Sequence, residues 1–75
     1  MRYQIIATSL TNRHRLLAMG DDEKYYLLSL TGIAVNSEPI SGTDAQRMQY
    51  DRSWVPTADR TRRTPQDLRL RMSTR

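Results

Sequence analysis

The sequence contains no cysteine and no phenylalanine, and it has one tryptophan and one histidine. Without cysteine, neither a disulfide framework nor a thiolate metal site can support a small fold. No apolar run approaches the roughly 18 residues of a membrane-spanning helix, and the first residues lack the long apolar core of a signal peptide. These absences predict a soluble protein of the cytoplasm.

The chain of 75 residues is too short for more than one domain or for a scaffold that encloses a catalytic cleft. Only 37% of its residues are hydrophobic, so the core must be small. A sheet of this size is marginally stable alone. We therefore expect either that residues 48–54 pack across one sheet face, or that a partner or a second copy adds stability.

Positive charge is concentrated in the second part of the chain. All but one of the 12 basic residues are arginine, the exception being Lys24. The charges balance up to Gly42, whereas residues 43–75 carry eight arginines against four aspartates and hence the whole net charge of +4. A neutral folding unit followed by a basic, core-poor extension is the simplest organisation.

Alternating and apolar stretches predict strands at 3–10, 13–19 and 24–30, with a short fourth strand at 33–35. Short polar connections separate them, which favours an antiparallel meander. In the first strand, Tyr3 shares one side with the other odd-numbered residues. The competing interpretation makes the second and third segments helical, beginning after Thr11 and Asp21, because short apolar runs do not decide between the two by periodicity.

Helix signals follow the predicted sheet. Thr43 and Gln46 have the spacing of a capping box, which indicates a helix that ends before Val55. Residues 48–54 also alternate as a strand would.

The clearest helix start in the chain lies near its end. Thr64 is placed as the N-cap, Pro65 as the first helical residue and Asp67 as an acid near the positive helix end. Only a turn or two can follow before the terminus, and such a helix frays in isolation. The sequence thus predicts an α+β fold: a small antiparallel meander of three to four strands with one short helix. The predicted domain covers residues 1–56, and residues 57–75 form a flexible basic extension.

Little in the sequence points to catalysis. His14 lies between Arg13 and Arg15, and no second histidine or cysteine can complete a metal site. The acidic run 21–23 lacks the alternating spacing of a calcium loop and is typical of a solvated turn. The glycines stand alone, without a phosphate-binding loop. We expect no enzymatic activity, no metal and no cofactor.

The arginines near the C-terminus are the better candidate site. They can neutralise several phosphates, and Tyr50 and Trp54 lie upstream, where they can stack on a base. An acidic protein surface fits the same charges, and a disordered solubilising tail is the remaining alternative. The predicted contact residues are Arg60, Arg62, Arg63, Arg69, Arg71 and Arg75.

Three aromatic residues are open to two interpretations. Adjacent residues of a strand point to opposite faces, so we expect that one of Tyr25 and Tyr26 faces outward. An exposed Tyr25 can anchor a partner, although cross-strand packing is the commoner role. Trp54 is more often a cover over a small core than a binding residue.

A compact N-terminal part (Arg2 to Val35) with an arginine-rich end (Arg60 to Arg75) resembles small phage-encoded proteins that take over host machinery. Regulators of bacterial RNA polymerase come first among these, and anti-CRISPR proteins second. The resemblance lies in size and layout, so no residue role is carried over from it. It implies a non-enzymatic inhibitor or antiterminator that docks near a nucleic-acid channel in the host cytoplasm.

Three functions are therefore expected as candidates: a regulator that binds a larger nucleoprotein machine, a direct nucleic-acid binder, and a small assembly subunit. If residues 60–75 serve only binding, their deletion leaves the melting behaviour nearly unchanged and weakens partner binding at low salt.

Overall fold

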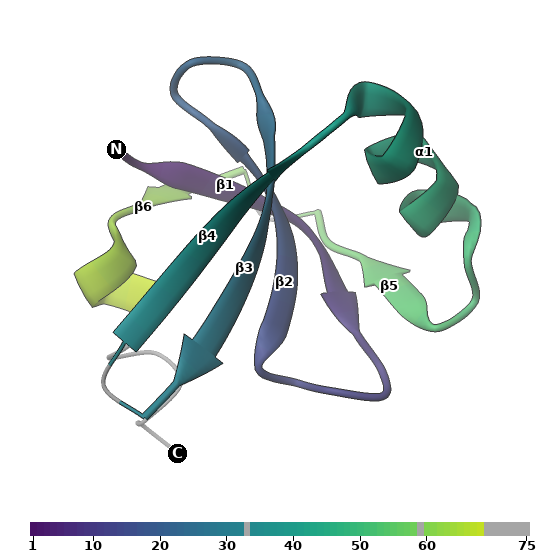
Figure 1. Cartoon of the computed structure of the whole chain (residues 1–75), viewed down its shortest axis with the longest axis horizontal. Helices are drawn as coiled ribbons and strands as arrows, with labels where there is room; N and C mark the ends of the chain where they lie inside the picture. The colour runs from purple at the N-terminus through teal and green to yellow at the C-terminus, as the bar shows by residue number, and fades with distance from the viewer. Residues whose placement is uncertain (33, 59, 69–75) are drawn as a thin grey trace.

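A computed structural model describes residues 1–32, 34–58 and 60–68. One antiparallel sheet dominates it, with strand order β4-β3-β2-β1-β5 and β6 paired to β1 (Figure 1). The elements in chain order are β1 (Tyr3–Ser9), β2 (Arg15–Gly20), β3 (Tyr25–Thr31), β4 (Ala34–Ile40), α1 (Gly42–Tyr50), β5 (Trp54–Pro56) and β6 (Arg62–Arg63).

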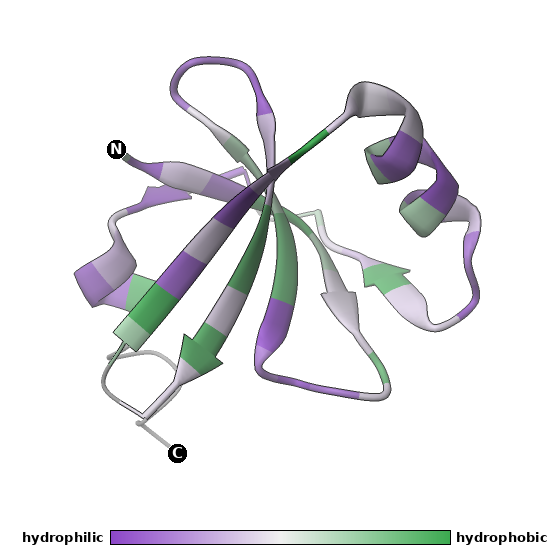
Figure 2. Cartoon of the chain, viewed as in Figure 1, coloured by the Kyte–Doolittle hydropathy of each residue, from purple (hydrophilic) through white to green (hydrophobic). Residues whose placement is uncertain are grey.

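The predicted α+β meander is confirmed, since β1 to β4 follow one another as antiparallel neighbours. The helical alternative for residues 11–31 is wrong. Apolar residues concentrate in β2 and β3 (Figure 2), each of which has a neighbouring strand on both sides. Glu23 and Gly32 adopt positive φ values of 63° and 57° in the turns before β3 and β4. Such tight reversals suit a hairpin and not a helix.

The fourth strand is longer than the sequence predicted. β4 extends from Ala34 to Ile40, although five of its seven residues are exposed and its middle three are polar. Its length follows from pairing with β3 along all seven residues and not from its own apolar content. A propensity argument cannot recognise such a strand.

An irregularity in β1 directs this strand to both faces of the sheet. Ile5 is opposite Ala18, whereas Ala7 is opposite Leu17, so Ile6 is an extra residue. Such a bulge shifts the alternation of side chains. The prediction that the odd-numbered residues of β1 share one side therefore holds only up to the bulge.

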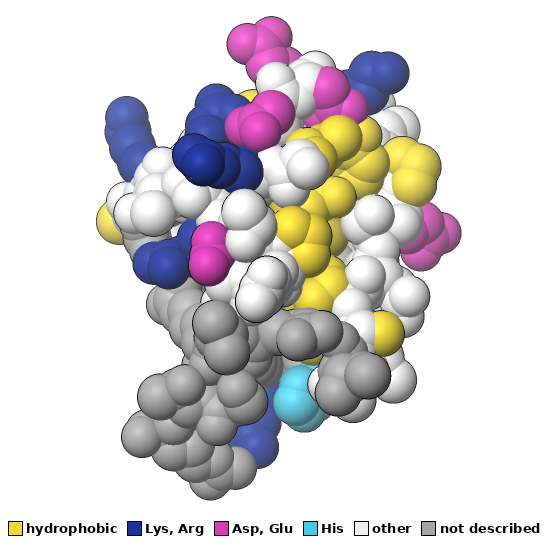
Figure 3. All heavy atoms as spheres, turned by 90° about the vertical axis from the view of Figure 1, so that its left-hand side faces the viewer, with side chains coloured by type: hydrophobic (Ala, Val, Ile, Leu, Met, Phe, Trp, Pro, Cys, Tyr) yellow, Lys and Arg dark blue, Asp and Glu magenta, His cyan; other side chains and the backbone are white. Residues whose placement is uncertain are grey.

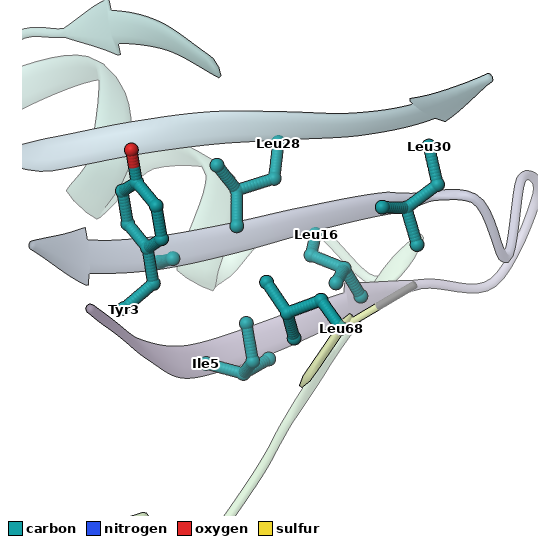
Figure 4. Packing of buried hydrophobic residues seen from close by; sticks show 7 residues of the cluster. Tyr3, Ile5, Leu16, Leu28, Leu30 and Leu68 are labelled. Carbon is teal, nitrogen blue, oxygen red and sulfur yellow. The ribbon is translucent and has the colours of Figure 1, made fainter. Parts of the chain in front are cut away.

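Two small apolar clusters result, one on each face. The first core gathers seven buried residues whose side chains point toward one another (Figure 4): Tyr3, Ile5, Leu16, Ala18, Leu28, Leu30 and Leu68. The second core contains Ala7, Leu17 and Ala45 of α1, with Trp54, Met48 and Tyr25 packed against it.

Because both faces are covered, neither Tyr25 nor Tyr26 is fully exposed. Tyr25 packs against the second core and Tyr26 against the first. The expectation that one of them faces outward assumed a sheet covered on one side only, and it is wrong for that reason.

The helix α1 begins two residues earlier than the Thr43 cap predicted. Ser41 is the N-cap, and its hydroxyl accepts a hydrogen bond of 3.1 Å from the Asp44 backbone N–H. Ser41 has its acid three residues later, which is the spacing that the cap requires. The helix ends before β5 as expected, and residues 48–54 do not form a continuous strand.

The structure differs most from the prediction over residues 57–58 and 60–68, which contribute to the domain. The Thr57 backbone N–H donates to the Ile6 carbonyl at 2.8 Å. Strand β6 extends the sheet, and Leu68 is 1% exposed within the first core. The predicted boundary after residue 56 is therefore too early.

The predicted cap before Leu68 is confirmed. Thr64 Oγ1 accepts a hydrogen bond from the Asp67 backbone N–H, and the Asp67 carboxylate accepts one from the Thr64 backbone N–H. Residues 65–68 are helical, and this reciprocal pair holds the first turn so that Leu68 faces the sheet. Residues 69–75 lie outside the described residues.

Candidate interaction surface

Strand β6 places arginines beside the beginning of β1. Arg62 is opposite Gln4 and Arg63 is opposite Tyr3, so both lie next to Arg2 at the start of the chain. Arg60 is exposed just before this strand. We call these four residues, Arg2, Arg60, Arg62 and Arg63, the arginine edge.

Carboxylates lie beside the arginine edge. Figure 3 views the molecule from the left-hand side of Figure 1. Basic and acidic side chains are intermingled over one part of this surface, beside a band of hydrophobic side chains. Asp21 Oδ1 lies 2.6 Å from Arg62 Nη1, and Asp21 Oδ2 accepts a hydrogen bond of 3.0 Å from the Arg2 backbone N–H. The hydrogen bond from the Arg2 backbone, followed by that from the Arg62 side chain, lowers the pKa of Asp21 below its ordinary value of 3.8. Asp21 is therefore ionised at neutral pH.

A second carboxylate lies nearby on the C-terminal turn. The pKa of Asp67 is also lowered, chiefly by hydrogen bonds from Thr64, with smaller contributions from the charges of Arg63 and Arg2. Four arginines thus lie beside Asp21 and Asp67, and Asp22 and Glu23 are exposed in the same turn as Asp21. Together they form a surface of mixed charge and not a uniform basic track.

The structure brings together part of the predicted contact set. Arg60 and Arg62 are exposed and Arg63 is half-buried, while Arg69, Arg71 and Arg75 lie outside the described residues. Arg62 also has a structural role, because its pair with Asp21 ties β6 to the turn after β2. Sequence reasoning missed Arg2.

The predicted aromatic contacts lie elsewhere. Trp54 is opposite Ser9 and Arg63 is opposite Tyr3, at the two ends of β1. Six residues of extended strand separate these ends by about 20 Å. Aromatic side chains and arginines therefore do not form the single base-stacking groove that their proximity in sequence had suggested.

Each aromatic side chain has its own environment. Trp54 is half-buried against the second core, which agrees with the role of a cover. Tyr25 packs on the same core, whereas Tyr50, at the end of α1, is 80% exposed. Of the three predicted aromatic contacts, Tyr50 is the most accessible to a partner.

The acidic turn is held by internal hydrogen bonds. Asp22 accepts one from the Lys24 backbone N–H and another from the Tyr26 hydroxyl. The bond to Asp22 and partial burial raise the pKa of Tyr26 above its ordinary value of 10.0. His14 is exposed and contributes backbone hydrogen bonds. Across residues 1–32, 34–58 and 60–68, no three histidine or acidic side chains are grouped as a metal site.

Comparison with known proteins found no matching family model, no similar curated protein and no similar solved structure. In the part of the chain that the structure describes, no helix is long and apolar enough to cross a membrane.

Proposed function

We propose that this protein is a non-enzymatic regulator that docks on a larger nucleoprotein complex in the cytoplasm and modulates transcription, with bacterial RNA polymerase as the first target. The arginine edge makes the contact. The observation that carries the proposal is the pairing of β6 with β1, which holds Arg62 and Arg63 beside Arg2.

Fixed arginines suit recognition of carboxylates or phosphates. A guanidinium group binds either anion through two parallel hydrogen bonds. On a mobile tail, each contact would carry the full entropic cost of ordering the side chain and its backbone. A strand pair orders the backbone in advance, so that cost is reduced for Arg62 and Arg63.

The acids beside the arginine edge favour a protein surface over bare nucleic acid. Asp21 and Asp67 would repel a continuous row of phosphates, whereas they can pair with lysine or arginine of a protein partner. The separation of Trp54 from the arginines removes the stacking platform that binders of single strands use. A channel entrance, with both acidic and basic groups near a polyanion, matches this mixture.

The test compares two double variants of equal charge change. Arg2→Gln with Arg60→Gln removes two charges of the arginine edge and spares the Arg62–Asp21 pair. Arg47→Gln with Arg52→Gln removes two exposed charges from α1 and the turn after it. Binding of each protein to nuclease-treated RNA polymerase and to naked DNA is measured between low and physiological salt.

We expect a one-to-one complex with the polymerase that survives nuclease. The edge variant should weaken it at least about tenfold at low salt, while the control variant binds as the wild type does. Tight, salt-sensitive retention on naked DNA alone would instead make this a nucleic-acid binder. If no polymerase complex forms, a pull-down from host lysate with and without nuclease tests for another machine, and an anti-CRISPR-type inhibitor is the next candidate.

A further inference from the structure

The strand β4 forms an open edge of the sheet. Among the described residues it pairs with β3 alone, along its whole length. An edge strand of seven residues offers a row of backbone donors and acceptors to another strand. In the strand order the arginine edge lies beyond β1, at the opposite end from β4.

The hydrogen-bond pattern shows which groups of β4 point outward. The Leu30 backbone N–H donates to the His14 carbonyl of the neighbouring chain segment on the β2 side. In an antiparallel sheet the backbone N–H and C=O groups of alternate residues point to opposite sides of the strand. Those of the even-numbered residues of β3 therefore point toward β2, and those of the odd-numbered residues point toward β4. The residues of β4 opposite the even-numbered ones are Val35, Ser37 and Pro39, and their backbone groups therefore point away from the sheet. Pro39 has no N–H to donate, which is why a proline is tolerated at this place.

The two ends of the sheet differ in charge on the side of β4. Arg13 and Arg15, both exposed, flank His14 at the end of the sheet where β4 begins. At the other end lie Glu38 and the turn 21–24, in which Asp22 and Glu23 are acidic, Lys24 is basic and Asp21 is paired with Arg62. A surface that is positive at one end and negative at the other is complementary to its own copy when the two run in opposite directions.

We propose that β4 pairs antiparallel with β4 of a second copy of this chain, about a twofold axis at Ser37, and so joins two sheets into one. In this register all seven residues overlap. The Ser37 N–H of each copy donates to the Ser37 carbonyl of the other, and each Val35 N–H donates to the Pro39 carbonyl. All outward N–H groups of β4 thus gain acceptors, and Pro39, which cannot donate, needs only its carbonyl.

Other residues fit the same register. Asn36 of one copy lies opposite Glu38 of the other, where an amide can donate to a carboxylate. The basic end of each sheet lies at the same end as the acidic end of the other, with Arg15 and Glu38 of the copy three strand spacings, about 14 Å, apart. An unrelated peptide would need the matching order of charges and, opposite Pro39, a residue whose carbonyl needs no N–H donor. A second copy of the chain meets both requirements. The dimer presents two arginine edges, one on each outer side.

The decisive variant is Ser37→Pro. This substitution removes the outward N–H at the centre of β4, just as the native Pro39 lacks one. The backbone hydrogen bonds between β4 and β3 are left in place. Ser37→Ala is the matched control, because it changes the side chain and keeps the N–H. Sedimentation equilibrium of both and of the wild type is measured from about 1 µM to about 1 mM, with circular dichroism to verify the fold.

We expect a concentration-dependent dimer for the wild type and for Ser37→Ala, weakened by salt. Ser37→Pro should lower the dimerisation constant at least about tenfold, since two hydrogen bonds are lost per dimer. Replacing Arg13 and Arg15 by Glu should weaken the dimer, and adding Glu23→Arg and Glu38→Arg should restore it.

Wild-type amide exchange keeps the test valid if Ser37→Pro fails to fold. The Val35 and Ser37 amides should exchange more slowly as concentration rises, and those of exposed loops should not. A wild type that stays monomeric to 1 mM, or a dimer in which these two amides exchange as fast as in dilute solution, overturns the proposal. So does an undiminished dimer of Ser37→Pro. None of these results depends on polymerase binding.

Discussion

Replacing Leu68 by alanine should destabilise the whole protein, although this residue lies near the C-terminus. Its side chain is 1% exposed and belongs to the first core with Tyr3, Ile5 and Leu28. Buried Leu→Ala changes cost about 2–5 kcal/mol, the value depending on how far the surroundings collapse. We expect about 2–3 kcal/mol, because a short terminal turn can shift to fill part of the cavity.

That loss is large for a domain of this size. At about 0.05–0.15 kcal/mol per residue, the free energy of unfolding is about 4–11 kcal/mol, so the loss at Leu68 is about a fifth of it or more. The melting temperature should fall by about 10–20 °C.

Urea unfolding followed by circular dichroism measures the effect. Gln66→Ala is the control, because Gln66 is exposed in the same helical turn and should change stability by less than about 0.5 kcal/mol. Deletion of residues 60–75 should destabilise at least as much as Leu68→Ala, contrary to the expectation from sequence. If both changes leave the unfolding midpoint within error of the wild type, the C-terminal segment is peripheral and the reasoning about the first core fails.

Three further perturbations test other contacts. Gly20→Ala should lower the free energy of unfolding by about 1–3 kcal/mol, because the added Cβ would lie 2.8 Å from Asp22 Oδ1 and 2.9 Å from the Tyr26 ring. Gly42→Ala is the control in the same urea titration. It should leave the stability unchanged, because the nearest atom to its Cβ is at 3.9 Å. The raised pKa of Tyr26 means that its bond to Asp22 stabilises the fold below about pH 10 and is lost as pH rises through the folded-state pKa; Tyr26→Phe should flatten this alkaline decline, and an unchanged profile would contradict it. Because the pKa of Asp67 is lowered, its ionised carboxylate stabilises the fold at pH values above the ordinary pKa of 3.8, and this stabilisation is lost as pH falls through the lower folded-state pKa. The difference in stability between the wild type and Asp67→Asn should therefore disappear in acid. A difference that does not depend on pH would exclude this role.

The central meander could be predicted from sequence because its signals are local. The apolar runs around Leu17 and Leu28 and the polar turns between them specify three neighbouring strands. The Thr64 cap was predicted for the same reason, since every group that it needs lies within four residues. Local chemistry of this kind does not depend on the rest of the fold.

Long-range pairing explains what sequence reasoning missed. Nothing near Arg62 and Arg63 indicates a strand, because their partner β1 lies some sixty residues earlier. The bulge at Ile6 is equally hidden, and with it the division of β1 between two cores. The candidate site was therefore predicted as a tail of arginines with neighbouring aromatics, whereas the fold joins two of those arginines to Arg2 and separates them from Trp54.

Amide hydrogen exchange of the free protein tests most directly whether the fold holds the arginines in place. The Thr57 and Leu68 amides donate to the Ile6 and Thr64 carbonyls, and we predict that they and the β6 amides are protected together with those of β1. Exchange of residues 57–68 at the rate of an unfolded chain, while β1 to β3 remain protected, would contradict the account and return these arginines to a tail.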